Sequence, residues 1–379
     1  MRIAIFGAGQ AGQFLLDEIR VRGGGTFHVD AFLDTYAGKE TIGDISVYRP
    51  DDYLQEHKPD AVFLAAGAQK AIWKMIEKVR SHGIDEIYML QDIAGKNRLP
   101  LFDATGNRLD YRLRKVRFSK ERPTLPYFEM PIVDACNLNC RGCLFGCNRH
   151  GEQDYMRLEE IQRDMERMAE LFEDIPWIRL LGGEPLLHPE LGRVLDVVRR
   201  IFPDTELDVC TNGLALPGLS KSILDAFVRN KVTVHISGYR PTYKLLDAIR
   251  AVLEKNGLDY YVLKREVFYK FYTQEAVNDA EASFAACPSA GCRELYRGRL
   301  AKCSAVLAFE RLNEQFGTDY IVTRNRDYFD IYDKNLTAWE IVRGLDAAAP
   351  ICRYCDTEHA VKFPWQSGQP EVLEDYLLS

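Results

Sequence analysis

The chain has 379 residues, a formal net charge of −7, 46% hydrophobic residues and ten cysteines. A negative net charge provides no broad basic surface, so we expect no nucleic-acid partner. The length permits two or three domains, and no apolar run is long enough to span a membrane. The N-terminus has no basic region followed by an apolar stretch. We therefore expect a cytoplasmic protein, in which cysteines are more often metal ligands than disulfides.

The first motif is glycine-rich and follows an apolar run at 2–6. Gly7, Gly9 and Gly12 match the pattern GxGxxG, and Asp34 follows the next predicted strand, 22 positions after Gly12. In dinucleotide-binding sheets this order places a pyrophosphate at a helix N-terminus and an acid on a ribose. Residues 1–95 resemble the nucleotide-binding domains of bacterial sugar-nucleotide epimerase/dehydratase proteins, which implies a Rossmann-like doubly wound sheet. NAD and a nucleotide sugar are both compatible ligands, and a domain that only docks or scaffolds is the alternative.

The stretch 96–124 differs in composition from its neighbours. It is polar and basic and has few periodic apolar residues. Such a stretch is most simply a solvated connector. We expect a linker with a small hairpin at 103–107, followed by a second domain at 125–280.

Three cysteines follow the apolar run 130–133. Cys136, Cys140 and Cys143 are spaced by four and then three positions. Three thiolates on a [4Fe–4S] cluster leave one iron without a protein ligand. A structural zinc site, which prefers C-x2-C pairs and four ligands, and buried free cysteines are the alternatives. The spacing resembles the CxxxCxxC signature of the radical S-adenosylmethionine enzymes, in which S-adenosylmethionine chelates that fourth iron. The aromatic residue usual before the third cysteine is replaced here by Gly142.

A second motif follows the strand predicted at 177–181. Gly182, Gly183 and Glu184 stand there, and Glu184 lies 41 positions after Cys143. Glycine lets a backbone approach a ligand closely, and a carboxylate can accept hydrogen bonds from an ammonium group. By the same resemblance, this segment holds the methionyl amino group. An ordinary βα turn is the alternative, and the cysteine triplet upstream favours the S-adenosylmethionine site.

Strands and helices alternate between 125 and 280, which predicts a parallel sheet with connecting helices. Further strands are expected at 206–210, 232–237 and 260–263. The resemblance implies a partial (β/α)6 barrel. Ligands in such barrels lie at the C-terminal strand ends, so Asn212 and Ser237 are candidates for binding S-adenosylmethionine, with ordinary turn formation as the alternative.

Five cysteines lie in the last predicted domain, 281–379. Cys287 and Cys303 stand in a C-x10-G-x4-C pattern, and Cys352 and Cys355 in C-x2-C. These patterns resemble the twitch and SPASM domains that follow many radical S-adenosylmethionine barrels, which implies that the four cysteines hold an auxiliary [4Fe–4S] cluster. Zinc and unliganded thiols are the alternatives. Cys292 is left over, as a hydrogen donor, a spare ligand or an inert buried residue.

These motifs predict an α/β radical S-adenosylmethionine oxidoreductase with two [4Fe–4S] clusters. The resemblance implies a 5′-deoxyadenosyl radical that abstracts hydrogen from a carbinol carbon of a sugar, cyclitol or nucleotide sugar, with dehydrogenation or epimerisation as the outcome. A peptide-modifying maturase and a non-enzymatic iron–sulfur redox sensor with a nucleotide-binding domain are the alternatives. The expected partners are a small-molecule substrate, carbohydrate or nucleotide-linked, and a flavodoxin- or ferredoxin-type reductant.

Overall fold

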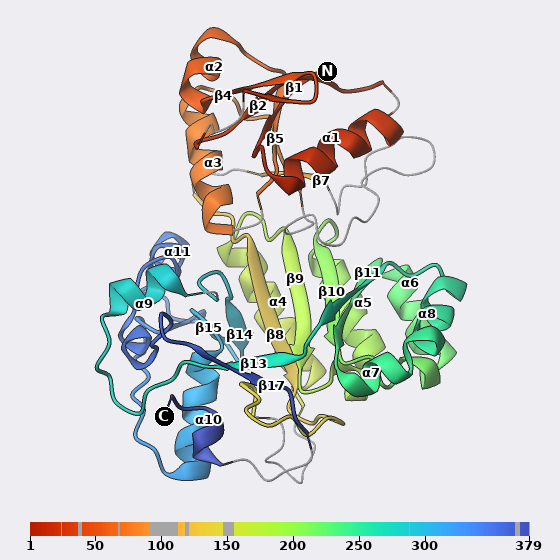
Figure 1. Ribbon diagram of the computed structural model, residues 1–379. Coiled ribbons are helices and arrows are strands. Elements are labelled where there is room, and N and C mark those ends of the chain that lie inside the picture. The colour runs from red at the N-terminus through yellow and green to blue at the C-terminus, as the bar shows by residue number, and fades with distance from the viewer. Residues whose placement is uncertain are drawn as a thin grey trace. The chain divides into compact units, whose positions relative to one another are not determined.

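The computed structural model describes nearly all of the chain, namely residues 1–23, 25–36, 40–66, 69–90, 113–117, 121–146, 155–287, 289–367 and 372–378. The hairpin expected at 103–107 lies outside these residues. The chain divides into two compact units, 1–118 and 119–379 (Figure 1). Within the described residues, no helix combines the length and the apolar character that crossing a bilayer requires.

The first unit is a seven-stranded sheet with the strand order β3-β4-β2-β1-β5-β6-β7. Its strands are β1 (Arg2–Phe6), β2 (His28–Leu33), β3 (Thr41–Ile42), β4 (Ile45–Tyr48), β5 (Ala61–Leu64), β6 (Ile87–Leu90) and β7 (Leu113–Lys115). The four central strands and β4 run parallel, and β3 and β7 pair antiparallel at the two edges. Strand β7 lies inside the stretch predicted to be a linker.

Helices cover both faces of this sheet because its strands are apolar on both sides. They are α1 (Gln10–Arg22), α2 (Pro50–Glu56) and α3 (Gln69–Ser81). Helix α1 packs Leu15 and Ile19 into one core with Ile3 and Ile5. Helices α2 and α3 belong to a second core, on the other side of β1 and β5.

The second unit is built on an eight-stranded sheet with the order β12-β11-β10-β9-β8-β14-β15-β16. The strands are β8 (Tyr127–Val133), β9 (Trp177–Gly182), β10 (Glu206–Thr211), β11 (Val232–Gly238), β12 (Tyr260–Lys264), β14 (Glu294–Tyr296), β15 (Arg299–Ala301) and β16 (Tyr328–Asp330). Strands β8 to β12 run parallel, which confirms the strands predicted from 177 to 263. Strands β14 to β16 come from the range predicted as a third domain, and they extend this same sheet.

Helices cover one face of β8 to β12. The helices α4 (Leu158–Leu171), α5 (Leu191–Ile201), α6 (Lys221–Arg229) and α8 (Leu246–Lys255) contribute buried residues to the core that these strands share. Helix α5 shows the reason, because Leu191, Val194, Leu195 and Val198 lie on one side of it and are buried. The alternate side chains of the strands point to the opposite face, which we call the inner face.

Most of the remaining elements of the second unit follow β12 in the chain. A two-stranded sheet joins β13 (Val267–Lys270) to β17 (Val361–Pro364), residues almost a hundred positions apart; it crosses near the ends of the larger sheet in Figure 1. The helices here are α9 (Ala280–Ala286), α10 (Ala305–Phe316) and α11 (Ala338–Leu345), and the short α7 (Arg240–Lys244) precedes β12. Among the described residues of this unit, 3-10 turns lie at Pro185–Leu187, Leu216–Gly218, Pro350–Tyr354 and Leu373–Asp375. Aromatic rings pack the centre of this region, among them Tyr272, Phe309 and Tyr354.

Candidate functional site

The three cysteines of the CxxxCxxC motif lie on one loop directly after β8. Cys140 is buried, and it shares a small apolar cluster with Cys136, Cys143 and Trp365. Burial raises the pKa of the Cys136 thiol to about 12. Three thiols gathered on one loop are the donor set that holds a [4Fe–4S] cluster with one iron left open. The residues present therefore fit an iron–sulfur cluster.

The glycines of the second motif allow two backbone segments to touch. Gly182 has a φ of +144°, and a Cβ built there would lie 2.2 Å from the carbonyl oxygen of Val133. A Cβ on Gly183 would lie 2.2 Å from the carbonyl oxygen of Ala135. The sequence suggested that glycine is needed for the approach of a ligand. The structure shows that it is needed for the approach of the cysteine loop, which it brings beside the end of β9.

Glu184 is completely buried, and its hydrogen bonds are made within the chain. Its carboxylate accepts from the backbone N–H of Leu186 at 3.1 Å, the hydroxyl of Thr211 at 2.7 Å and the backbone N–H of Asn212 at 2.8 Å. Burial raises the pKa of this carboxyl to about 7, against the effect of these donors. Glu184 thus ties the end of β9 to the end of β10, so that it positions Asn212.

Asn212 connects this strand end to the cysteine loop. Its side-chain amide donates to Oδ1 of Asn137 at 2.6 Å and lies 3.9 Å from the sulfur of Cys136. Ser237, at the end of β11, lies 3.7 Å from the sulfur of Cys210 on β10. The structure therefore brings Asn212 to the cysteine loop, whereas the hydroxyl of Ser237 contacts the neighbouring strand.

The inner face of the sheet carries charged side chains that sequence reasoning did not select. Arg179 on β9 donates to both carboxylate oxygens of Asp208 on β10, at 2.9 and 2.8 Å, and to the hydroxyl of Tyr261 on β12 at 3.1 Å. Glu129 on β8 is buried and accepts from the hydroxyl of Tyr127 at 2.7 Å. The sequence signal for them is the alternation of charged and apolar residues within strands, such as Leu207-Asp208-Val209. Burying a charged side chain costs free energy unless it is paired, so a charge within a buried strand indicates a partner or a functional role.

His235 on β11 lies on the same face and stacks on Tyr261, with ring centroids 4.6 Å apart. It is 1% exposed, and neither ring nitrogen has a hydrogen-bond partner among the described residues. Burial, together with the nearby cations of Arg179 and Arg265, holds the pKa of His235 well below its usual value. The inner face thus offers a neutral imidazole with free hydrogen-bonding capacity beside an ion pair.

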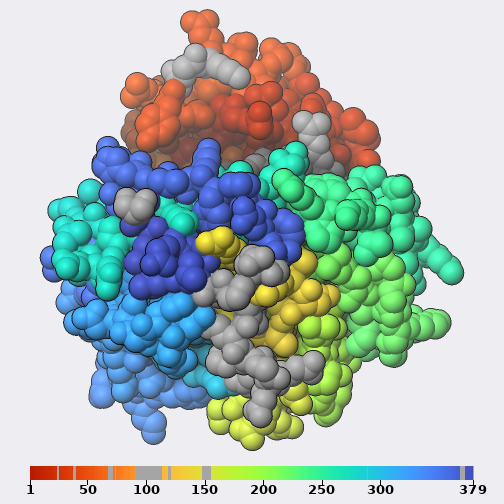
Figure 2. All heavy atoms as spheres, turned by 60° about the horizontal axis from the view of Figure 1, so that its bottom comes forward, coloured from red at the N-terminus to blue at the C-terminus, as the bar shows by residue number. Residues whose placement is uncertain are grey.

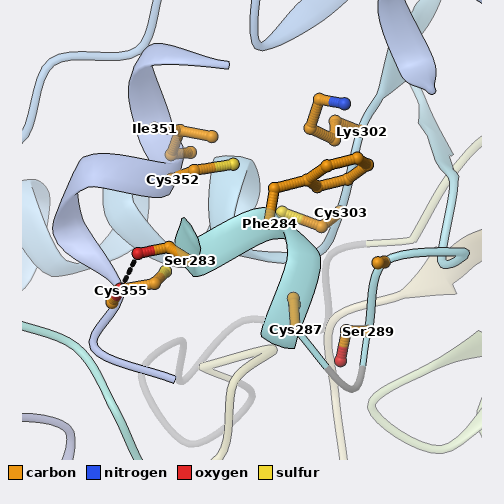
Figure 3. A pocket seen from close by; sticks show the side chains of 10 residues that line it. Ser283, Phe284, Cys287, Ser289, Lys302, Cys303, Ile351, Cys352 and Cys355 are labelled. Atoms are coloured by element: carbon orange, nitrogen blue, oxygen red, sulfur yellow. Dashed lines mark hydrogen bonds between the residues drawn. The ribbon is translucent and has the colours of Figure 1, made fainter. Parts of the chain in front are cut away.

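The four cysteines of the C-terminal region line one pocket (Figure 3). Cys287 follows α9, Cys303 follows β15, and Cys352 and Cys355 belong to the 3-10 turn 350–354 and its end. Burial raises the pKa of Cys303 to about 12. The amino group of Lys302 lies beside this pocket, 4.3 Å from the ring centroid of Phe284. The tertiary structure therefore gathers four thiols from three separate segments.

Within the described part of the chain, no three His, Cys, Asp or Glu side chains converge closely enough to hold a single metal ion. A [4Fe–4S] cluster does not require such convergence, because each thiolate binds a different iron. The first three cysteines share one apolar cluster, and the other four line one pocket.

Cys292 is separate from the residues that line the pocket. Burial is the largest cause that raises the pKa of its thiol, and the charge of Glu129 adds to it. The same thiol is within electrostatic range of Arg179 on the inner face and of Cys303 and Cys287 at the pocket. Its charge interactions thus extend both to the inner face and to the four-cysteine pocket.

In the first unit, two of the three glycines of the GxGxxG motif are required by close backbone contacts within the unit itself. A Cβ on Gly7 would lie 2.1 Å from the carbonyl oxygen of Ala65, and one on Gly12 would lie 1.9 Å from the carbonyl oxygen of Gly7. Gly9 alone of the three faces open space. Asp34 accepts from the backbone N–H of Ala8 at 3.0 Å, so this acid is bound to the glycine loop.

Comparison with known proteins assigns the central part of the chain. Residues 130–259 match the family model of the Radical SAM superfamily, where SAM denotes S-adenosylmethionine. The chain carries a radical SAM superfamily domain. The family implies a [4Fe–4S] cluster and S-adenosylmethionine as cofactors, and the described loop with Cys136, Cys140 and Cys143 lies within the matched range.

Curated relatives match over part of the chain. The GTP 3′,8-cyclase of Nautilia profundicola is 30% identical over 165 residues, which are 41% of this chain and 50% of the relative. The GTP 3′,8-cyclase of Moorella thermoacetica is 36% identical over 102 residues, which are 26% of this chain and 31% of the relative. The chain thus spans between about a third and a half of the length of these relatives.

Solved structures are similar at a lower level. BtrN in complex with AdoMet and 2-DOIA is 17% identical, with a TM-score of 0.35, and the likeness covers 62% of this chain and 94% of that one. Native anSMEcpe with bound AdoMet is 18% identical, with a TM-score of 0.30, and the likeness covers 38% of this chain and 44% of that one. At these identities and TM-scores, the similarity assigns no activity to this chain.

Proposed function

We propose that the chain is a radical SAM oxidoreductase that removes a hydrogen atom from a carbinol carbon of a small hydroxyl-rich substrate. The radical SAM domain supports the first part of this proposal. The observation that carries the second part is the polar inner face, where Arg179, Asp208, Tyr261 and His235 offer donors and acceptors in a buried setting. Sugars, cyclitols and nucleotide sugars present the hydroxyl groups that such a surface can bind.

Cys136, Cys140 and Cys143 would hold the site cluster. When bound and reduced, that cluster supplies the electron that cleaves S-adenosylmethionine and releases a 5′-deoxyadenosyl radical. The chain itself supplies the shape of the site. Glu184 holds Asn212 against the cysteine loop, and Gly182 and Gly183 keep the two strand ends in contact.

The outcome after hydrogen removal depends on where one electron and one proton go. Cys287, Cys303, Cys352 and Cys355 would hold a second [4Fe–4S] cluster, an electron acceptor that an oxidation to a ketone requires. The buried carboxylate of Glu129 on the inner face can take the proton. If Cys292 instead returns a hydrogen atom from its S–H bond, the product is an epimer, and the resulting sulfur radical then needs one electron and one proton.

A cyclase is the second candidate, because the curated relatives are named GTP 3′,8-cyclases and not dehydrogenases or epimerases. Those matches cover less than half of this chain. For the first unit, we propose a nucleotide or nucleotide-sugar site at the glycine loop, supported by the open space in front of Gly9.

The test is an anaerobic assay of the reconstituted, reduced protein with S-adenosylmethionine. Candidate cyclitols and nucleotide sugars carry deuterium at each carbinol carbon in turn, and GTP is assayed in parallel. Transfer of deuterium into 5′-deoxyadenosine, with a mass loss of two hydrogens or an epimer as product, supports the proposal. Turnover of GTP with none of the carbinol substrates would overturn it in favour of a cyclase.

Two variants separate the cysteine groups. Cys136→Ala should abolish formation of 5′-deoxyadenosine. Cys355→Ala should retain cleavage of S-adenosylmethionine but lose the oxidised product. If both variants still cleave S-adenosylmethionine, the proposed radical SAM activity is refuted.

A further inference from the structure

The C-terminal segment 361–367, which contains β17, lies directly against the cysteine loop. The indole N–H of Trp365 donates to the sulfur of Cys140 at 3.1 Å, and both residues are buried, at 6% and 5% exposure. The backbone N–H of Arg141 donates to the carbonyl oxygen of Gln366 at 2.9 Å, and Cys140 and Ser367 form an isolated bridge. In Figure 2 the dark-blue C-terminal part of the chain adjoins the yellow surface of the segment that follows β8.

Gly142 allows this segment to lie where it does. Its φ is +69°, and a Cβ built on it would lie 2.9 Å from the ring of Phe363. The position before Cys143 is the one at which the sequence departs from its family pattern by lacking an aromatic residue. An aromatic side chain at this position would collide with the ring of Phe363 on β17. The packing of segment 361–367 against the cysteine loop therefore depends on glycine at position 142.

Packing holds Trp365 in place independently of its hydrogen bond. Its ring lies 5.3 Å from that of Tyr239, between ring centroids, and Tyr239 lies 6.3 Å from Phe268. Phe268 in turn contacts Phe363 at 5.9 Å, across the β13–β17 pair. The indole is therefore a fixed donor that points at one sulfur ligand.

We propose that Trp365 is a positioning residue that raises the reduction potential of the cluster at Cys136, Cys140 and Cys143. Reduction adds negative charge, which is shared by the thiolate sulfurs. An N–H group that points at one of these sulfurs stabilises the more negative state, and such bonds are among the factors that set cluster potentials. The proposal rests on the proposed cluster, and it assigns to the C-terminal segment a part in how easily that cluster is reduced.

The test compares Trp365→Phe with the wild-type holoenzyme by an EPR-monitored reductive titration. The site cluster is identified as the one whose signal changes on addition of S-adenosylmethionine. The substitution keeps an aromatic ring but removes the N–H donor. We expect the equilibrium constant for reduction to fall up to about tenfold, a negative shift of about 59 mV for one electron.

Trp177→Phe is the matched control, because it is the same substitution in the same unit, at an indole whose N–H has no hydrogen-bond partner among the described residues. Its potential should equal that of the wild type. An unchanged potential in Trp365→Phe with full cluster content would overturn the inference. A wild-type protein that binds no iron–sulfur cluster would overturn both this inference and the proposed function, so the two failures are distinguishable.

A second measurement needs no variant. Wild-type protein labelled with ¹⁵N in its indole groups should show a ¹⁵N coupling to the reduced site cluster in pulsed EPR. Absence of that coupling would contradict the hydrogen bond, even if Trp365→Phe fails to fold.

Discussion

Glu294 should make the stability of the second unit decrease as the pH rises. It stands on β14, directly opposite Glu129 on β8 in the sheet register, and it is 1% exposed. Burial is the main reason that the pKa of Glu294 is raised from 4.5 to about 8, and the charge of Glu129 adds to the effect. One of its carboxylate oxygens has no hydrogen-bond partner among the described residues.

The sign follows from proton linkage. Near pH 7 the folded chain holds a proton on Glu294 that the unfolded chain has released, so folding takes up a proton and stability falls with rising pH. The loss begins above the unfolded pKa of 4.5 and ends near the folded pKa of about 8. At about 1.4 kcal/mol for each pKa unit, the total is at most about 5 kcal/mol, of which about 2 kcal/mol falls between pH 6 and 8.

The assay is urea unfolding at pH 6, 7 and 8, followed by tryptophan fluorescence, since three of the four tryptophans lie in the second unit. Glu294→Gln cannot ionise, so its unfolding free energy should lose about 2 kcal/mol less than that of the wild type between pH 6 and 8. Glu340→Gln, in an exposed capping box of α11, is the control and should keep the wild-type slope. Equal slopes in Glu294→Gln and wild type would refute the reasoning.

Three further outcomes are expected. Gly183→Ala should lower both stability and affinity for S-adenosylmethionine, measured by urea unfolding and calorimetry, because its Cβ would lie 2.2 Å from the carbonyl oxygen of Ala135. Arg179→Gln should cost about 3 to 5 kcal/mol of unfolding free energy, since it leaves Asp208 buried without its cation; a double variant that also carries Asp208→Asn should recover part of this loss. Cys355→Ala should lower the iron content of the reconstituted chain by about four atoms, and an unchanged content would contradict the second cluster.

Local patterns in the sequence were sufficient to predict where the parallel strands lie in the chain. The segments 206–210 and 232–237, in which apolar and polar residues alternate, form β10 and β11, because the apolar residues of each segment are buried in the core that the helices cover. The radical SAM domain was recognisable for a similar reason. Its cysteine triplet lies within one short loop, so that chain spacing alone limits how its ligands can be arranged.

The contacts made across long separations could not be predicted in this way. Trp365 reaches Cys140 over 225 positions, and the four-cysteine pocket draws on segments from Cys287 to Cys355. The sequence indicated that Gly182 and Gly183 matter, but only the folded chain shows that they accommodate the cysteine loop. Sequence periodicity reports which face of an element is buried, whereas the choice of partner depends on how all the elements pack together, and that choice decides the chemistry of the inner face.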